Sequence, residues 1–225
     1  MKILYEDRYL IVCEKPVGVE SQVSSTGKVN MPELLSAYRK EKGEDTYIGL
    51  VHRLDTATGG VMVYSKMPEV TGKLSALVSS DDYKKTYLAV VHGAPEEREG
   101  ELRDLLYHDK RKNKSFVCDK KRRGVKEALS YYRLLDTTDS ADGQKMSLVE
   151  VELITGRTHQ IRVQFASRKM SLVGDGKYGS RDNKATIALW SQRVEFTHPV
   201  TKSRICSNST PPDVYPWNLF DINKK

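Results

Sequence analysis

The segment that most constrains the fold is residues 52–64, where a polar, glycine-ended stretch runs directly into four apolar residues. The stretch reads His-Arg-Leu-Asp-Thr-Ala-Thr-Gly-Gly, and Val-Met-Val-Tyr follows at 61–64. Strand-type residues after a Thr-Gly-Gly turn predict a buried strand, so Asp55 is expected on the loop that feeds it. Loops held by a rigid scaffold often carry catalytic groups. An Asp before Thr also commonly caps a turn, and the spacing alone favours that simpler interpretation.

The length and composition indicate a globular protein with one sizeable core. The chain has 225 residues, of which 38% are hydrophobic, and this length allows a single large domain. No apolar run approaches the ~20 residues that a membrane helix needs. Residues 1–7 lack the apolar stretch of a secretory signal. We therefore expect a cytoplasmic protein without membrane contact.

The spacing of cysteine and histidine gives no sign of a metal centre or a disulfide framework. Cys13, Cys118 and Cys206 are far apart and form no CxxC pair, and the five histidines form no HExxH pair. Structural zinc sites and disulfide frameworks need closer or more numerous ligands. We expect no bound metal.

The positive charge is concentrated in two runs that flank a short apolar segment. The formal net charge is +7, from 37 basic and 30 acidic residues, which suits a polyanionic partner. Ser-Phe-Val-Cys at 115–118 lies between the basic runs 110–114 and 120–123. Residues 110–123, here called the flap, are predicted to form a basic β-hairpin that neutralises phosphates. A solvated surface loop is the usual interpretation of any one charge run. The RNA contacts predicted in the flap are Lys110, Arg111, Lys112 and Lys114.

Strand-like and helix-like segments follow one another without a regular βαβ alternation. Residues 136–144 are expected to form an exposed, turn-rich connection, and the Pro-rich tail from Pro211 to pack only in part. This pattern favours an α+β fold with a large, mainly antiparallel sheet. We expect strands at 2–6, 9–14, 61–65, 83–91, 127–135 and 146–154, helices at 32–42, 68–81 and 159–169, and a β-hairpin over 187–206.

Six segments, in order over residues 3–201, carry a family resemblance. Two strand-like stretches lead into Lys-Pro-Val-Gly at 15–18, and the signature stretch 52–60 comes next. The later segments are 85–93 (Lys-Thr-Tyr-Leu-Ala-Val-Val-His-Gly), 155–163 (Thr-Gly-Arg-Thr-His-Gln-Ile-Arg-Val), 174–179 (Gly-Asp, then Tyr-Gly) and 196–201 (Phe-Thr-His-Pro-Val-Thr). Together they resemble the motifs of the RluA-type pseudouridine synthases, whose signature reads H-R-L-D-x-x-T-S-G. Gly59 departs from it, because the family normally has Ser there.

The resemblance implies the pseudouridine synthase catalytic fold, a large mixed, mainly antiparallel sheet with flanking helices and a central active-site cleft. Many members of the family carry a small RNA-binding domain before the catalytic one. In this chain the catalytic strands begin at residue 3, so we expect no such module. The expected organisation is one catalytic domain over residues 1–225, with 208–225 as a C-terminal tail.

The resemblance also implies the reaction. Conversion of uridine to pseudouridine breaks the N-glycosidic bond, turns the uracil and rejoins it through carbon. No redox change occurs and no group is released, so no cofactor is expected. The resemblance assigns Asp55 as the catalytic carboxylate. A carboxylate can add to the sugar or act as a base on it, and the sequence leaves both roles open.

Two further residues receive catalytic roles from the resemblance. Arg162 is expected to keep Asp55 ionised, because a nearby cation opposes the protonation that loss of water favours. The alternative interpretation of Arg162 is an ion pair on the protein surface. The Tyr matching Tyr87 packs against the target uracil in the family, and the alternative is a core aromatic residue. Arg157 is expected either to contact phosphate or to pin its loop.

The target uridine must leave the base stack to reach Asp55, and flipping costs a few kcal/mol. The resemblance implies that Arg53 enters the vacated space. His52 beside it is equally compatible with RNA contact and with a hydrogen bond inside the loop. Lys85 is expected on the rim of the cleft, in contact with RNA.

The leading hypothesis is an RNA pseudouridine synthase, an isomerase that acts as a monomer on ribosomal or transfer RNA. One alternative is a catalytically silent RNA-binding protein of the same fold, but binding alone needs none of Asp55, Tyr87 and Arg162. Another is a nucleoside hydrolase. Such chemistry usually needs two carboxylates, and the only second candidate in the motifs is Asp175, whose glycine neighbours suit a turn better.

Overall fold

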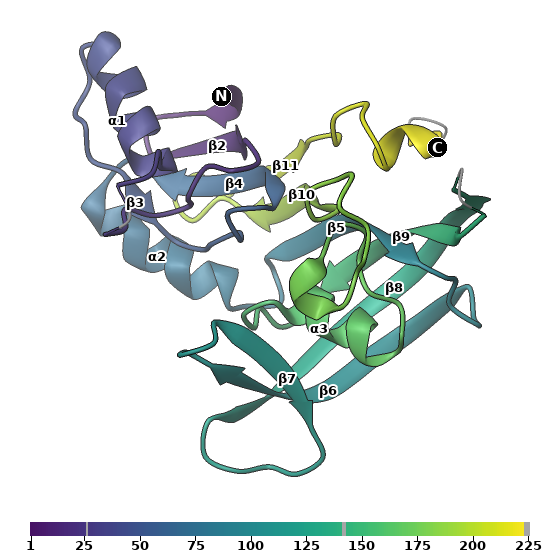
Figure 1. Ribbon diagram of the computed structural model, residues 1–225. Helices are drawn as coiled ribbons and strands as arrows, with labels where there is room; N and C mark the ends of the chain where they lie inside the picture. Colours follow the sequence, from purple (N-terminus) through teal and green to yellow (C-terminus); the bar gives the residue numbers. More distant parts are fainter. Residues whose placement is uncertain (26, 141–142, 223–225) are drawn as a thin grey trace. The chain divides into compact units, whose positions relative to one another are not determined.

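The structure is a computed structural model that describes residues 1–25, 27–140 and 143–222 (Figure 1). Its helices are α1 (Met31–Glu41), α2 (Pro68–Val78) and α3 (Gln160–Ser167), with short 3-10 turns η1 (Gly176–Tyr178) and η2 (Trp217–Leu219). Its strands are β1 (Lys2–Glu6), β2 (Leu10–Lys15), β3 (Gly49–Leu50), β4 (Gly59–Ser65), β5 (Lys84–His92), β6 (Glu99–Asp109), β7 (Lys114–Cys118), β8 (Val125–Asp139), β9 (Lys145–Leu153), β10 (Leu189–Thr197) and β11 (Arg204–Asn208).

These strands hydrogen-bond in the order β1-β2-β4-β10-β5-β9-β8-β6-β7, with β11 beside β10 and β3 beside β4. Most neighbouring strands pair antiparallel, for example β2 with β4 and β8 with β9. The predicted α+β class with a large sheet is therefore confirmed. The chain divides into two compact units: unit 1 holds residues 1–85 and 191–210, and unit 2 holds residues 86–190 and 211–225.

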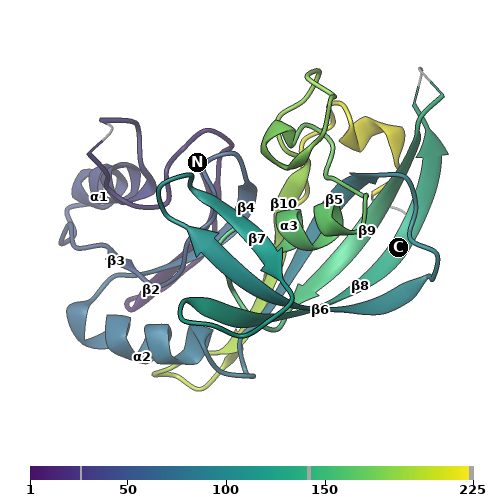
Figure 2. The same cartoon turned by 60° about the horizontal axis from the view of Figure 1, so that its bottom comes forward.

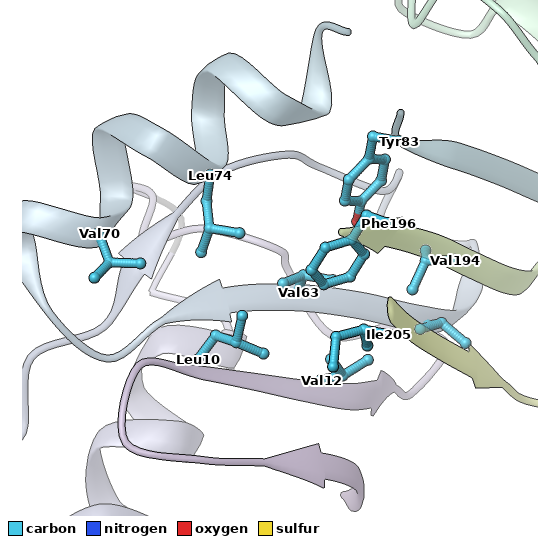
Figure 3. Packing of buried hydrophobic residues seen from close by; sticks show 10 residues of the cluster. Leu10, Val12, Val63, Val70, Leu74, Tyr83, Val194, Phe196 and Ile205 are labelled. Atoms are coloured by element: carbon cyan, nitrogen blue, oxygen red, sulfur yellow. The ribbon is translucent and has the colours of Figure 1, made fainter. Parts of the chain in front are cut away.

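The core of unit 1 lies between the strands and α2 (Figure 3). Every residue of β4 is buried, as the apolar run after the signature loop predicts. Pro68 occupies the first turn of α2, where its missing N–H costs nothing. In the same core Tyr83 stacks on Phe196 with ring centroids 5.1 Å apart. The other members of the core cluster are Leu10, Val12, Val61, Val63, Val70, Leu74, Val194 and Ile205.

Gly60 marks a close approach of two strands in unit 1. Its φ is +113°, and a Cβ built there would lie 2.1 Å from the carbonyl oxygen of Ser191 on β10. An L side chain would be strained by both the backbone conformation and the overlap. The final glycine of the signature loop is thus required for packing, independent of any chemistry.

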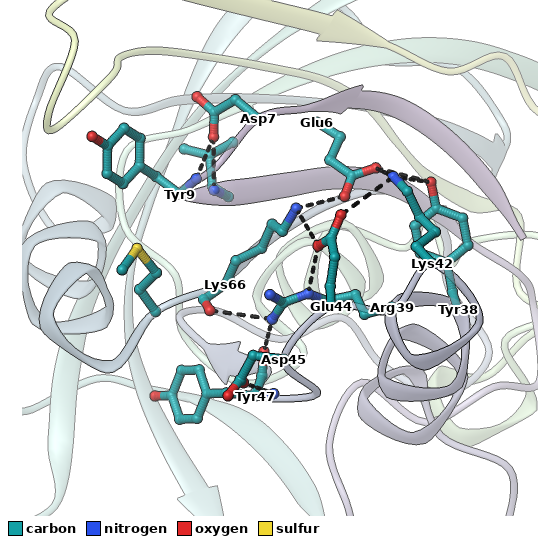
Figure 4. Close-up of polar contacts among 12 residues, drawn as sticks. Glu6, Asp7, Tyr9, Tyr38, Arg39, Lys42, Glu44, Asp45, Tyr47 and Lys66 are labelled. Carbon is teal, nitrogen blue, oxygen red and sulfur yellow. Dashed lines mark hydrogen bonds and ion pairs between the residues drawn. The ribbon is translucent and has the colours of Figure 1, made fainter.

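A buried polar network joins the end of α1 to the β1–β2 turn in unit 1 (Figure 4). Lys66 is 6% exposed and pairs with Glu6 at 2.7 Å and with Glu44 at 2.8 Å. Arg39 pairs with the same Glu44 at 3.2 Å. Hydrogen bonds from Lys66 and Lys42 lower the pKa of Glu6 to about 2, against the opposing effect of burial. A groove of about 840 Å³ lies over this network. Five of the charged residues that line it, Glu6, Arg39, Lys42, Glu44 and Lys66, are paired with one another, which indicates a structural role.

Unit 2 is built on the long antiparallel pair β8 and β9. The expectation that residues 136–144 form a connection is wrong for its first part, because β8 continues to Asp139 and Thr138 pairs with Met146. Cross-strand pairing overrides the turn preference of the Asp and Thr residues there, after a register shift between Leu134 and Asp136. The C-terminal tail adds Trp217 and Phe220 to the core of this unit.

The predicted hairpin around the flap is confirmed (Figure 2). Strand β6 leads into an exposed turn and β7 returns beside it, so His108 pairs with Ser115 and Tyr107 with Phe116. One face of this hairpin packs on α3, through a small cluster that includes Leu106 and Val163. The hairpin therefore lies directly against the helix that carries Arg162.

We predict opposite effects for two Gly→Ala substitutions in unit 1. Gly60→Ala places a Cβ against the Ser191 backbone and should lower the midpoint of thermal unfolding by roughly 4 °C or more. Gly72→Ala is the matched control in α2, where a Cβ meets nothing within 4 Å. It should stabilise the helix by about 0.5–1 kcal/mol. Circular dichroism during heating measures both, and a Gly60→Ala midpoint at or above that of the parent contradicts the close approach.

Candidate functional site

The loop that carries Asp55 is held by backbone hydrogen bonds on both sides. The Asp55 carbonyl accepts from the N–H of Thr58 at 2.9 Å, which closes a tight turn directly after the carboxylate. The Thr56 carbonyl accepts from the N–H of Gly18 at 2.8 Å. The Ser21 hydroxyl donates to the carbonyl of Leu54 at 2.7 Å and accepts from its N–H at 3.0 Å. The loop is therefore fixed while the Asp55 side chain stays partly exposed.

Lys15, the last residue of β2, is a buried cation in contact with this loop. It is 0% exposed, and its Nζ donates to the carbonyls of Pro16 at 2.9 Å, Val19 at 2.6 Å and Thr56 at 3.2 Å. Burial lowers the pKa of Lys15 to about 8, and the negative charge of Asp55 opposes this fall. Sequence reasoning noted Lys15 only as part of a turn and missed this role. The available signal was a lysine at the end of an apolar strand run.

His52 and Arg53, which precede Asp55, have different environments. The Nε2 atom of His52 accepts from the N–H of Val63 at 3.1 Å and lies 3.3 Å from the Tyr83 hydroxyl. Burial, with a smaller effect from the charge of Lys85, lowers the pKa of His52 to about 3, so the ring is neutral. Arg53 is exposed, and its guanidinium lies 3.4 Å from the side-chain oxygen of Gln22. His52 is thus hydrogen-bonded to β4 and to Tyr83, outside its own loop, while RNA contact stays a prediction for both.

Lys85 lies at the start of β5, with its Nζ 5.7 Å from the centroid of the Tyr83 ring. Burial lowers its pKa. The same ring contacts His52 edge-on at 5.9 Å. In unit 1 a lysine and a neutral histidine therefore share one aromatic neighbour beside the signature loop.

Arg162 forms a buried, two-pronged ion pair in unit 2. Its Nε donates to Oδ2 of Asp175 at 2.7 Å, and its Nη2 donates to Oδ1 at 2.9 Å. Arg162 is 4% exposed and Asp175 0%. Such paired geometry is the strong form of a charge-assisted hydrogen bond. Asp175 lies in a turn, as its glycine neighbours suggest, and its carboxylate has the additional role of holding the guanidinium, which the sequence did not indicate. The expected pairing of Arg162 with Asp55 stays a prediction.

Tyr178 covers the guanidinium of Arg162, with its ring centroid 5.1 Å from Cζ. Its hydroxyl accepts from the N–H of Ser115 on β7 at 2.7 Å and lies 3.0 Å from Nδ1 of His159. One aromatic side chain therefore connects the flap to the N-terminus of α3.

The remaining predicted residues are also placed in unit 2. Tyr87 on β5 is 6% exposed, which fits either the core or the stacking interpretation. Arg157 donates through Nε to the carbonyl of Glu127 at 2.9 Å on a partly exposed surface. This contact supports the interpretation that Arg157 pins its loop.

The flap residues differ in how firmly they are held. Lys110, Arg111 and Lys112 are exposed in the turn, where Asp109 accepts from the backbone N–H groups of Arg111 and Lys112. Lys114 donates through Nζ to the carbonyl of Lys177 at 2.6 Å. Three of the four predicted phosphate contacts therefore project from the turn, and the fourth is anchored at the edge of the hairpin.

The described part of the chain shows neither a metal-binding cluster nor a membrane-spanning helix. Within residues 1–25, 27–140 and 143–222, no cluster of three or more His, Cys, Asp or Glu side chains is placed to hold a metal ion. None of the helices seen there is long and apolar enough to cross a membrane.

Comparison with known proteins finds that the chain is similar to RNA pseudouridine synthases in each case described below. The family profile described as RNA pseudouridylate synthase matches residues 9–167. A Bacillus subtilis protein named as an uncharacterized RNA pseudouridine synthase is 30% identical over 94% of this chain and 69% of its own length. A Buchnera aphidicola ribosomal large subunit pseudouridine synthase C is 32% identical over 90% of this chain. This chain spans 64% of that relative's length, slightly less than two thirds.

A Vibrio vulnificus tRNA pseudouridine synthase C is 27% identical over 91% of this chain and 88% of its own length. Among solved structures, human RNA pseudouridylate synthase domain containing 1 superposes with a TM-score of 0.79 and 20% identity. It covers 95% of this chain and 84% of the human one. At that identity the likeness bears on the fold alone.

We predict that Arg162→Met destabilises the protein much more than Arg157→Met. Removing Arg162 leaves a buried carboxylate without its cation, which costs about 3–5 kcal/mol in comparable pairs. Removing Arg157 eliminates one partly exposed hydrogen bond, which is worth about 0.5–1.5 kcal/mol. Urea unfolding at neutral pH measures both free energies. Equal destabilisation by the two variants, or a larger effect of Arg157→Met, shows that the ion pair with Asp175 does not stabilise unit 2.

Proposed function

Because this chain belongs to the RNA pseudouridylate synthase family, we propose that it isomerises particular uridines in structured ribosomal or transfer RNA to pseudouridine. The observation that carries the proposal is the fixed signature loop, in which a partly exposed Asp55 lies in the field of the buried Lys15. A single placed carboxylate is what the reaction requires, because the uracil is detached and returned with no net change in atoms. The names of the relatives, which include synthases for ribosomal and for transfer RNA, support this substrate class.

Asp55 is the catalytic carboxylate in this proposal. It either forms a bond to the anomeric carbon of the sugar or removes a proton from the sugar, and in both cases the glycosidic bond to uracil breaks. The freed base turns and joins the sugar through its fifth carbon, and this new bond replaces the bond from the sugar to Asp55 where one has formed. The proton of the fifth carbon leaves to solvent, and the former glycosidic nitrogen takes up a proton, so the atoms balance. Lys15 places a buried positive charge near Asp55, and the negative charge of Asp55 opposes the fall in the pKa of Lys15 that burial causes.

Tyr87 and Arg162 are proposed to assist this chemistry. Tyr87 offers a buried aromatic face for the uracil, which must stay in place while it is detached. Arg162 supplies a guanidinium whose orientation is fixed by Asp175. We expect Arg162→Met to reduce turnover more than Arg157→Met does, in the same order as their effects on stability.

RNA recognition is proposed to use basic and polar residues of both units. Arg53 is suited to fill the gap that a flipped uridine leaves. The partly exposed Lys85 and Arg157 and the neutral His52 are proposed as further RNA contacts. The turn of the flap supplies Lys110, Arg111 and Lys112 for phosphates. We further propose that residues 1–225 form one catalytic domain. The protein is proposed to act as a monomer and without a cofactor. Its proposed location is the cytoplasm, where the RNA named for its bacterial relatives is found.

The alternative is an RNA-binding protein of this fold without activity. The arrangement around Asp55 argues against it. A buried lysine with three backbone acceptors and a neighbouring carboxylate costs desolvation, and binding to phosphates does not need it. Loss of turnover without loss of RNA affinity, on neutralising Asp55, separates the two functions directly.

We predict that Asp55→Asn abolishes isomerisation while folding and RNA affinity stay close to those of the parent. The substitution removes the charge and keeps nearly the same size and hydrogen-bonding capacity. Release of tritium from the fifth carbon of uridine in bulk cellular RNA reports turnover. Asp81→Asn, at an exposed position of unit 1, is the control and should behave like the parent. Activity of Asp55→Asn within a few-fold of the parent excludes Asp55 as the catalytic group.

We predict that replacing Lys110, Arg111, Lys112 and Lys114 together by Ala weakens RNA binding and makes it less sensitive to salt. Removing one cation–phosphate interaction lowers the slope of log affinity against log salt by roughly 0.7–0.9. Turnover at saturating RNA should change much less than affinity, because the flap holds no proposed catalytic group. Filter binding across a potassium chloride series measures the slope. An unchanged slope means that the flap is an ordinary solvated loop.

A further inference from the structure

The face of the hairpin turned away from α3 carries aromatic residues that the core does not use. Phe116 on β7 is 37% exposed, and Tyr107 lies directly across from it on β6. Tyr107 also pairs with Val125 on β8, so three neighbouring strands present one apolar row. Directly opposed residues of a sheet place their side chains on the same face. The row therefore forms a small flat surface beside the basic turn of the flap.

Both rings of this row are accompanied by cations. The Nζ of Lys114 lies 5.8 Å from the centroid of Phe116, and the Cζ of Arg122 lies 5.5 Å from the centroid of Tyr107. The basic runs 110–114 and 120–123 thus each place a cation over one of these rings. An exposed hydrophobic residue by itself needs no explanation. A pair of cross-strand aromatic residues between two clusters of cations has the composition of a nucleic-acid surface.

We propose that Phe116 and Tyr107 form a stacking platform for an unpaired nucleotide of the RNA substrate. The base lies on the aromatic row, and its flanking phosphates meet the cations of the flap. This inference rests on the proposed function, since it assumes RNA as the substrate, and it adds a binding subsite away from Asp55. Stacking on an aromatic side chain is open to every base, because each has a π face.

The chemistry of the row favours an unpaired nucleotide over a helical RNA. In a double helix the base faces are covered by their neighbours, and a protein reads mainly phosphates and 2′-hydroxyls. Lysines alone would serve that purpose, and exposed aromatic rings would add nothing. Unpaired loops and bulges offer free base faces, and proteins recognise them by stacking.

The geometry of β7 argues against a protein strand as the occupant. β7 is the last strand in the order of the sheet, and such an edge can pair with another chain. Here Ser115 uses its N–H for the Tyr178 hydroxyl and its own hydroxyl for the carbonyl of Thr158. Lys114 folds over the same edge to the carbonyl of Lys177. The edge is thus occupied in part, while the face with the aromatic row is partly exposed, with Phe116 its most open member.

The test compares two neighbouring and equally exposed residues of β7. Phe116→Ala removes the platform, and Val117→Ala is the matched control, because Val117 is 38% exposed and the alternation of a strand places it on the opposite face. Fluorescence anisotropy gives the affinity of the full chain for a labelled oligouridylate and for an RNA duplex of the same length, across a potassium chloride series. Phe116→Leu, which keeps an apolar side chain without a π face, replaces Phe116→Ala if the latter does not fold.

We expect Phe116→Ala to weaken binding of the oligouridylate about 10-fold, with an unchanged salt slope, since the cations of the flap are all kept. Phe116→Trp should bind at least as tightly as the parent, and Val117→Ala within a factor of about two of it. Affinity for the duplex should not change. Equal effects of Phe116→Ala and Val117→Ala on the oligouridylate, or an equal weakening for duplex and oligouridylate, overturn the platform.

RNA binding and catalytic turnover are measured by separate assays, so the two proposals can fail independently. Tritium release by the parent enzyme tests the proposed function, and the affinity ratio of the two RNAs tests the platform. An inactive parent whose oligouridylate binding is still weakened by Phe116→Ala refutes the isomerase and keeps the platform. An active parent whose affinities are unaffected by Phe116→Ala refutes the platform and keeps the isomerase.

Discussion

The candidate site depends on the hydrogen bonds between a buried lysine ammonium and backbone carbonyls in and near the signature loop. Lys15 contacts three backbone carbonyls, and one of them, Thr56, directly follows Asp55. An unpaired buried cation is costly, so the loop must keep these carbonyls turned inward to compensate it. Lys15 thus contributes to the shape of the loop, together with the hydrogen bonds of Gly18, Ser21 and Thr58, and places a positive charge near its carboxylate. Gly60 lies in β4 and allows this strand to approach β10 closely, which a residue with a Cβ atom would prevent.

Unit 2 fixes a buried cation in a comparable way. The guanidinium of Arg162 is held on one side by the two oxygens of Asp175 and covered by the ring of Tyr178. The Tyr178 hydroxyl in turn receives the N–H of Ser115 from β7. The basic hairpin and the buried arginine are consequently parts of one packed assembly within this unit. The exposed cations of the flap and the buried guanidinium are different residues, so each can be altered without the other.

Features encoded by short stretches of sequence could be predicted, and features that depend on distant contacts could not. The apolar run 61–64 and the proline at the start of α2 indicated a buried strand and a helix because each acts locally. Lys15 and Thr56 are 41 positions apart, and the partner of Asp175 lies on a separate helix, so neither role has a local signal. The end of β8 was missed because Asp and Thr favour turns, whereas pairing with β9 decides their conformation. The catalytic roles predicted for Asp55 and Arg162 come from the family motifs, whereas spacing alone favours simpler roles for both.

The central claim is that this chain makes pseudouridine in cellular RNA through Asp55. Mapping pseudouridine across ribosomal and transfer RNA in cells that lack the protein tests it most directly, with the parent gene and its Asp55→Asn variant restored in parallel. The account predicts that one or a few defined sites lose the modification, that the parent gene restores them, and that the variant does not. Identical maps with and without the protein, or full restoration by the variant, would contradict it.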